Sequence, residues 1–250
     1  MTNGTVIGRM LAAVLVTAAL ACILFLRFPQ LDLAVSRHYF DAARGGFLYS
    51  HAPVWEAVRA VLRASSYALG VGAILLCALG PRVPLWMRLP RRVTGFVAAS
   101  YVAGPVVFVN LWMKRSSGRA RPRNVTEFGG PDHYTPPFTF ADQCHVNCSF
   151  VSAETAGMAT LCLTLGLLIA PRLTGVRRWL FVAGLAALVV FTGWLRIAFG
   201  GHFLSDTVFA ALAMGLIVPV VYLAFGLAEQ PVGRERARAY GAQTASRALP

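Results

Sequence analysis

Three short clusters of ionisable residues stand out in a chain that is otherwise apolar. They run from Lys114 to Pro122, from Ser149 to Glu154, and from Arg196 to Asp206. Only 13% of the 250 residues are charged. Because an ionisable side chain near lipid is costly, such residues favour a functional interpretation. Several cations with one histidine and two carboxylates suit chemistry on a phosphate group.

The third cluster has the pattern of an oriented nucleophile or base. His202 and Asp206 are four residues apart, and on a helix this spacing puts both side chains on one face. A carboxylate bonded to one ring nitrogen fixes the tautomer and leaves the other nitrogen free to react. A lone histidine is more often structural. A histidine with this aspartate and the upstream Arg196, at a membrane boundary, favours catalysis.

The first two clusters have the residue types of an anion site. Lys114 supplies a point charge and Arg121 a bidentate fork for phosphate oxygens, although a basic flank after a span is the plain alternative. The second cluster places small and hydroxyl residues at a helix start, where free backbone N–H groups bind anions. Taken alone, simple N-capping by Ser149 or Ser152 explains that cluster better. Glu154 is the residue that capping explains least.

Membrane helices must position these clusters. Hydrophobic residues make up 57% of the chain, which is too apolar for a soluble domain. The apolar runs predict an all-α integral membrane protein, a six-helix bundle that forms a single domain over residues 1–250. Most runs reach the roughly 20 residues that a bilayer requires. The first run is taken as a retained helix, because no small-residue cleavage site follows it. The predicted spans are 7–26, 58–80, 93–113, 149–171, 179–196 and 206–228, and residues 229–250 form a cytoplasmic tail.

Topology explains the basic excess better than nucleic-acid binding does. The net charge is +13, and no stripe of cations with interleaved aromatic residues suggests RNA or DNA. Six spans put both termini on one side, which holds 12 of the 23 basic residues. Six of the other 11 belong to the clusters, and without them the count is 12 against 5. The positive-inside rule then predicts cytoplasmic termini in a cell (inner) membrane, with the clusters on the outer, periplasmic face.

Two further groups of residues lie outside the main motifs. Glu56, Arg59 and Arg63 share one helical face, where a structural, snorkelling role is favoured over contact with a lipid headgroup. Cys144 and Cys148 lie in the long outer loop 114–148. They can form a disulfide if the local turn brings their Cα atoms within about 7 Å; free thiols are the equal alternative.

Together the clusters resemble the motifs of the type 2 phosphatidic acid phosphatase (PAP2) superfamily. Those motifs are Lys, six residues and Arg-Pro; then Pro-Ser-Gly-His; then Ser-Arg, five residues, His, three residues and Asp. The matching positions are Lys114, Arg121, Pro122, Arg196, His202 and Asp206. Leu195 replaces the serine of the third motif, and Val151 to Glu154 replace the whole second motif except its serine. Cys148 to Glu154 is similar to a Cys-Ser-Phe-x-Ser-Gly-Glu stretch of lipid A phosphatase-like members, with Ala153 for glycine.

The resemblance implies a metal-independent lipid phosphatase with no cofactor. In that scheme His202 attacks phosphorus to form a phosphohistidine, and Asp206 orients the ring. The residues implied to bind the phosphate are Lys114, Arg121, Arg196, Ser152 and the backbone N–H of Ala153. Glu154 stands where the family has the histidine that protonates the leaving group. It is therefore a weak general acid, a base for hydrolysis of the intermediate, or no catalyst. Arg115, Arg119 and Arg123 are interpreted as bystanders or headgroup contacts.

The implied partner is a phosphorylated lipid carrying a phosphomonoester or a diphosphate. The candidates are lipid A, undecaprenyl diphosphate, phosphatidylglycerol phosphate and phosphatidic acid. A diphosphate has a good leaving group and would depend less on an acid at Glu154. Two other functions stay open: a lipid phosphotransferase, and a non-catalytic phospholipid-binding or transport protein that keeps the cationic pocket. The altered second motif favours the binding protein, whereas the intact His202 and Asp206 favour the enzyme.

Overall fold

The fold is a bundle of long helices, seen here in a computed structural model that describes residues 3–50, 52–82, 84 and 89–229. Within that part, six helices are long and apolar enough to cross a membrane, as the sequence predicted. The helices are α1 (Asn3–Arg27), α2 (Gln30–Arg37), α3 (Pro53–Leu79), α4 (Arg91–Tyr101), α5 (Lys114–Ser116), α6 (Ala153–Ile169), α7 (Gly175–Ala198) and α8 (Leu204–Ala224). A π-helix (Val102–Met113) joins α4 to α5, so these three form one span.

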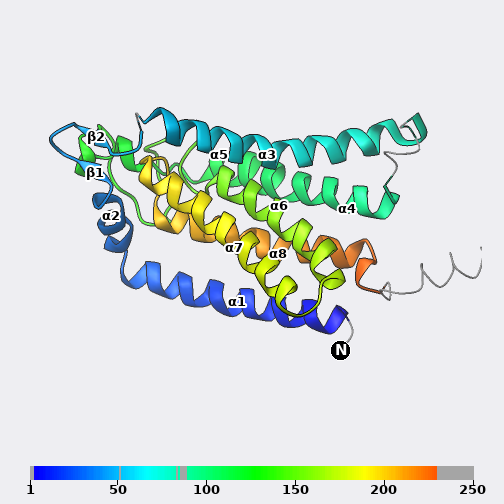
Figure 1. The fold of residues 1–250 in the computed structure, drawn as a ribbon. Helices are drawn as coiled ribbons and strands as arrows, with labels where there is room; N and C mark the ends of the chain where they lie inside the picture. The colour runs from blue at the N-terminus through cyan, green and yellow to red at the C-terminus, as the bar shows by residue number, and fades with distance from the viewer. Residues whose placement is uncertain (1–2, 51, 83, 85–88, 230–250) are drawn as a thin grey trace, which may run out of the picture.

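The long helices run side by side, and the short elements gather at one end of the bundle (Figure 1). That end carries α2 and a small antiparallel hairpin of β1 (Phe40–Asp41) and β2 (Gly46–Phe47). Helix α1 begins and α8 ends at the opposite end. An even number of spans therefore returns the described chain to the side on which it started.

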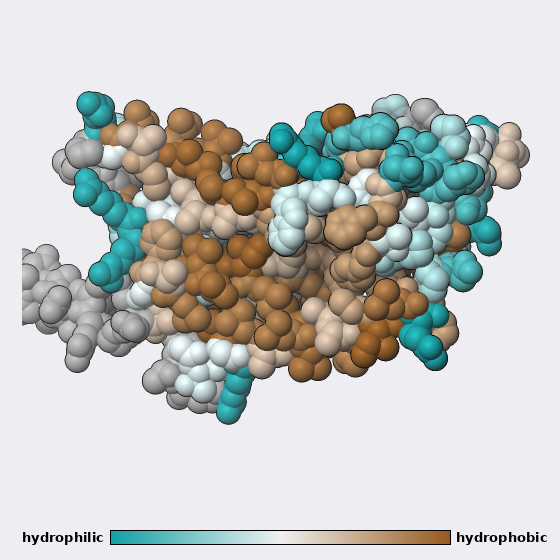
Figure 2. Space-filling model, turned by 180° about the vertical axis from the view of Figure 1, so that it is seen from behind, coloured by the Kyte–Doolittle hydropathy of each residue, from teal (hydrophilic) through white to brown (hydrophobic). Residues whose placement is uncertain are grey.

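The core of the bundle lies around α6 and α8. Half of the most apolar stretch of α6 is buried, compared with 6% of that of α1. The apolar side chains of α1, such as Leu15, Val16 and Leu20, are exposed, which suits contact with lipid. Apolar residues form a broad band between the two polar ends of the molecule (Figure 2).

Several helix starts differ from the predicted bounds; α1 and α7, for example, each begin four residues earlier than predicted. Helix α3 begins at Pro53, five residues before the predicted 58, because proline suits the first turn of a helix. Helix α6 begins at Ala153 instead of 149, because Ser152 caps it. The backbone N–H of Thr155 donates to Ser152 Oγ at 3.4 Å. The predicted tail lies outside the described residues from 230 onward.

Aromatic side chains fix α3 against α7 near the end that carries α2. The rings of Trp55 and Trp194 lie 5.7 Å apart, and the indole N–H of Trp194 donates to the hydroxyl of Tyr39 at 3.0 Å. Trp55 is one turn before Arg59, and Trp194 is two residues before Arg196. This packing therefore helps to fix the positions of Arg59 and Arg196, which belong to the site described next.

Candidate active site

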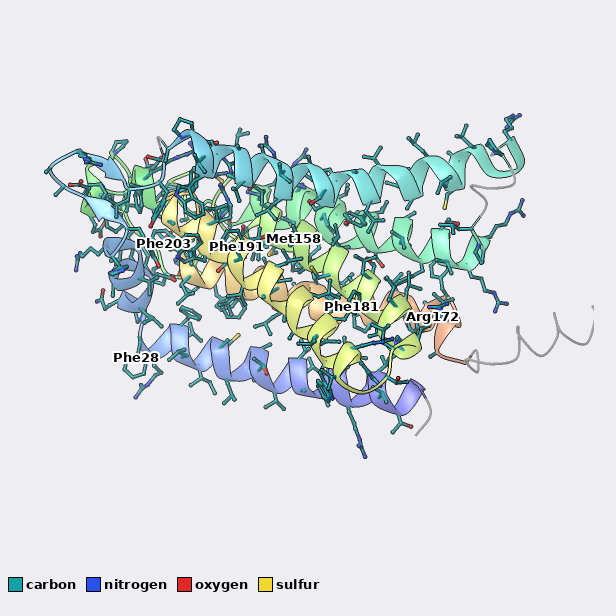
Figure 3. The ribbon with its side chains drawn as sticks, viewed as in Figure 1. Phe28, Met158, Arg172, Phe181, Phe191 and Phe203 are labelled. Carbon is teal, nitrogen blue, oxygen red and sulfur yellow. A yellow bond between two sulfur atoms is a disulfide. The ribbon has the colours of Figure 1, made fainter. Side chains whose placement is uncertain are left out.

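The three clusters meet at the end of the bundle that carries α2. Two backbone hydrogen bonds tie them together: Ser149 N–H donates to Arg119 O at 2.9 Å, and Ser152 N–H donates to Asp206 O at 3.1 Å. Figure 3 shows Phe203 at this end and Arg172 at the other. The residues predicted to form one site are therefore brought together.

His202 lies beside Asp206, although the two residues do not share one helix. Helix α7 ends at Ala198 and α8 begins at Leu204, so His202 belongs to the bend between them. Its ring Nδ1 lies 3.4 Å from Asp206 Oδ2, and both side chains are buried. The predicted pairing is present, while its geometry comes from the bend.

Asp206 is held by donors from three parts of the chain. Its Oδ2 accepts from the backbone N–H of Phe203 at 2.8 Å and from the hydroxyl of Ser149. Its Oδ1 accepts from Arg119 Nη1 at 2.6 Å. A carboxylate with so many donors is fixed in position, and it can fix the ring of His202 in turn.

Arg119 is a central buried residue, so its interpretation as a bystander or headgroup contact was wrong. Its side chain is 1% exposed, and Nη2 donates to Asp32 Oδ2 at 2.7 Å. Burial acts to lower the pKa of Arg119, but the charges of Asp206 and Asp32 outweigh it and raise the pKa. Asp32 also accepts from Ser205, at the start of α8. In the sequence, the one indication of this ion-pair network is Asp32, an acid between the apolar residues Leu31 and Leu33.

A disulfide-closed loop covers two of the predicted phosphate ligands. Cys144 and Cys148 are bridged, with their Cα atoms 5.5 Å apart. Buried Lys114 donates to Asn147 Oδ1 at 3.0 Å and to the carbonyl of Cys148 at 2.9 Å. Arg121 donates to the carbonyl of Asn147 at 2.8 Å. Asn147 therefore orients both cations, a role that no sequence pattern indicated.

Arg196 is 4% exposed, and one of its N–H groups lacks a hydrogen bond within the described part of the chain. Its Nε is buried and has no hydrogen-bond partner among the described residues. The chain after α7 passes so close that a Cβ at position 201 would lie 2.4 Å from Arg196 Nη2. A side chain at position 201 would therefore displace this guanidinium.

Glu154 pairs with an arginine that the sequence analysis assigned to the membrane surface. Arg59 donates to both oxygens of the Glu154 carboxylate, from Nη2 at 2.7 Å and from Nε at 3.0 Å. Arg196 Nε lies 3.7 Å from the same carboxylate. The structural, snorkelling role that the sequence favoured for Arg59 therefore does not account for its ion pair with Glu154. Arg63, one turn later, is exposed.

The electrostatics of the site keep His202 neutral. Burial lowers the pKa of its imidazole, and the charges of Lys114 and Arg196 lower it further. Asp206 opposes them, but the pKa stays well below its usual range. Burial also lowers the pKa of Arg121, with the charge of Arg123 adding to the effect. A neutral histidine has the free lone pair that a nucleophile needs.

The linked charges of the site do not balance. Apart from Glu56, a 48% exposed carboxylate at the edge of the cluster that solvent screens, five cations and three carboxylates leave two positive charges, with His202 neutral. The members are Lys114, Arg119, Arg121, Arg196 and Arg59, with Glu154, Asp206 and Asp32. Such a cluster, largely buried, attracts an anion of two negative charges, which is the charge of a phosphate monoester near pH 7.

Comparison with known proteins identifies the family. The family model described as "PAP2 superfamily" matches residues 94–229, more than half of the chain. The chain belongs to the PAP2 superfamily. Three lipid A 4'-phosphatases are similar to this PAP2 protein. The one from Francisella tularensis subsp. novicida is 30% identical over 210 residues, covering 83% of this chain and 92% of the relative. The one from Rhizobium leguminosarum is 30% identical over 220 residues, covering 82% and 91%.

A third relative of this PAP2 protein, from Rhizobium etli, is 29% identical over 221 residues. No solved structure matches the chain significantly. The family and the names of the relatives together support a lipid phosphatase, a hydrolase of the kind that the motifs predicted.

Proposed function

We propose that this PAP2 protein removes a phosphate monoester from a membrane lipid through a phosphohistidine on His202. The observation that carries the proposal is the buried pair of His202 and Asp206, set among cations that leave two positive charges uncompensated. A binding protein without turnover would need the cations alone. It would have no use for a neutral histidine oriented by a carboxylate that is itself held by Arg119.

In the proposed reaction His202 Nε2 attacks phosphorus while Asp206 stabilises the proton on Nδ1. The bond from phosphorus to the lipid oxygen breaks, and the leaving oxygen takes a proton from a water molecule. The hydroxide that remains then breaks the bond from phosphorus to nitrogen, which releases inorganic phosphate and restores neutral His202. The reaction consumes one water molecule overall. Lys114, Arg121 and Arg196 neutralise the phosphate oxygens, with the backbone N–H of Ala153 at the start of α6.

Ser152 has a narrower part in this proposal than the family pattern implies. Its hydroxyl oxygen already accepts from the backbone N–H of Thr155 at 3.4 Å and from the hydroxyl of Thr155 at 2.9 Å. Its own O–H remains a donor for a phosphate oxygen. Ser152 thus caps α6 and keeps the free N–H groups of the first turn aimed at the anion.

Among the candidate substrates we favour a phosphorylated lipid A. All three relatives reported above are named lipid A 4'-phosphatase. The net charge of the site also matches one phosphate monoester better than a diphosphate, which carries more negative charge. The site would face the periplasm from the inner membrane, with both termini in the cytoplasm, because the basic residues outside the clusters favour that orientation.

The proposal is tested by phosphate release from purified protein in detergent. The substrates are lipid A, undecaprenyl diphosphate, phosphatidylglycerol phosphate and phosphatidic acid, and His202→Ala is the control. We expect the highest kcat/KM on lipid A and no detectable release by the variant. Release that His202→Ala leaves unchanged would overturn the mechanism. Transfer of phosphate to an added lipid alcohol, in place of release to water, would make the protein a phosphotransferase.

Orientation is tested separately with fusions to the C-terminus. A cytoplasmic C-terminus makes a fused green fluorescent protein fluorescent and a fused alkaline phosphatase inactive. The reverse pair of results would place the site on the cytoplasmic face and contradict the proposed location.

A further inference from the structure

The partner of Glu154 limits what this carboxylate can do. Both of its oxygens accept charge-assisted hydrogen bonds from Arg59, at 2.7 and 3.0 Å, and Arg196 Nε is 3.7 Å away. A carboxylate in a bidentate pair with a guanidinium is the ionised form, because the pair depends on its negative charge. Glu154 in this state has no proton to give to a leaving group.

Arg59 keeps donors to spare after binding Glu154. A guanidinium has five N–H groups, and the bonds to Glu154 use two of them. The other three have no hydrogen-bond partner among the described residues; the nearest carboxylate, Glu56 Oε2, lies 3.6 Å from Nη1. The side chain of Arg59 is 22% exposed, so these donors are accessible from outside the protein.

From these contacts we infer that Arg59 is a fourth cation of the phosphate site and that Glu154 is its positioning residue. Through Glu154 the ion pairs hold Arg59, from α3, near Arg196, from α7. Its three free N–H groups then bind an oxygen of the lipid phosphate. The inference rests on the proposed phosphatase reaction, and it replaces an acid or base role for Glu154 by an electrostatic one.

The charge of Arg59 already acts within the site. Its charge lowers the pKa of Arg121, although burial and the charge of Arg123 lower that pKa more. Without Arg59, the linked residues would carry one net positive charge instead of two. The fourth cation is therefore the one that matches the site to a dianion.

The test compares two arginines on the same helix in the full-length protein. Arg59→Ala and Arg59→Lys are compared with Arg63→Ala, which removes the same charge one turn away from an exposed position. The readouts are KM, kcat and the inhibition constant of inorganic phosphate. We expect Arg59→Ala to raise KM and the inhibition constant about 10- to 100-fold, the effect of losing a hydrogen bond to a charged group. Arg59→Lys should recover part of the loss, and Arg63→Ala should match the wild type.

Glu154 needs its own variants, because a general acid and a positioning residue predict different results. Removing a general acid costs about 10²- to 10⁴-fold in rate and deletes a limb of the pH profile. We expect Glu154→Gln to lose at most about tenfold and to keep the shape of the profile, since the amide oxygen still accepts from Arg59. The double variant Arg59→Ala/Glu154→Ala should be no worse than the poorer single variant, because the two residues act as one unit.

Folding and the underlying reaction are controlled in the same series. Thermal unfolding identifies any variant that has lost its structure, and the phosphate-induced rise in melting temperature is also measured in the His202→Ala background, where no turnover is needed. An unchanged response to phosphate in Arg59→Lys and Arg59→Ala overturns the inference, as does a missing pH limb in Glu154→Gln. If His202→Ala still releases phosphate, the proposed reaction fails instead, whatever Arg59 does.

Discussion

Arg119 Nη1 donates a hydrogen bond of 2.6 Å to Asp206 Oδ1, and both side chains are buried. The same guanidinium reaches Asp32 from the segment after α1, so one cation compensates two buried carboxylates. The residue that orients His202 is therefore itself oriented from a distant part of the chain. Support of this kind fixes the direction of a reactive ring more firmly than a single ion pair does.

Removing Arg119 should destabilise the protein severely. Arg119→Ala leaves two buried carboxylates without their cation, and breaking a buried pair in this way costs about 3–5 kcal/mol. Arg115→Ala serves as the matched control, because Arg115 is exposed and four residues away; we expect it to change the free energy of unfolding by less than about 0.5 kcal/mol. Thermal unfolding in detergent measures both. Equal stability of the two variants would show that the Arg119 network contributes nothing.

His202 should stay neutral where an ordinary histidine becomes charged. Its pKa lies well below the usual range, so the imidazole keeps its lone pair as the pH falls through about 6.5. An NMR titration from pH 8 to pH 6 should therefore leave its ring signals unshifted, with the assignment made from their absence in His202→Ala. The unfolded chain does bind this proton, so the depressed pKa costs stability only below about pH 6.5. A midpoint near 6.5 for this signal would contradict the electrostatic account.

Reduction of the disulfide should weaken substrate binding. The bridge between Cys144 and Cys148 closes the loop in which Asn147 accepts from Lys114 with its side-chain oxygen and from Arg121 with its backbone carbonyl. We expect a reductant, or Cys144→Ser/Cys148→Ser, to lower kcat/KM about tenfold, the effect of one misplaced charged hydrogen bond. The double variant should no longer respond to reductant. Cys77→Ser alters an exposed free cysteine and should respond as the wild type does; a reductant effect that persists in the double variant would assign it elsewhere.

Gly201→Ala should impair turnover more than it impairs folding. The added methyl group would lie 2.4 Å from Arg196 Nη2, so the guanidinium must move away from the site. A displacement of about 1 Å at a reacting group can cost about 100-fold in kcat/KM. Gly184→Ala is the control in the same helix as Arg196, because a Cβ there meets no atom within 4 Å. Wild-type kinetics in Gly201→Ala would mean that Arg196 does not have to hold its observed position.

The six spans, and the clusters that the fold brings together, could be predicted from the sequence because both signals are local. Hydropathy over about 20 residues indicates a span. Each motif lies within a few residues of the end of a span, so the order of the spans predicts which motifs lie on the same side. The starts of α3 and α6 were missed by a few residues because caps, not hydropathy, decide where a helix begins. His202 lies between two predicted spans, and the bend that brings its ring to Asp206 has no sequence signal of its own.

The supporting contacts could not be predicted, because they join residues far apart in the chain. Arg59 and Glu154 are separated by 95 positions, and Arg119 and Asp206 by 87. Nothing local distinguishes Arg59 from Arg63, or Arg119 from Arg115; only the packing of α3 against α7 and the folding of the outer loop do so. Asn147 likewise belongs to no sequence motif. Only the folded loop, closed by the disulfide, shows that it lies beside Lys114.

Asp32 and Arg59 both precede residue 94, where the match to the PAP2 family begins. A fragment starting there would contain every motif residue, yet Arg119 would lose one of its two carboxylates and Glu154 would lose its bidentate partner. The motif-bearing region is thus not an autonomous unit. Helices α2 and α3 complete the ion pairs of the site, so split or truncated versions of this protein would have to supply both helices in trans to recover activity.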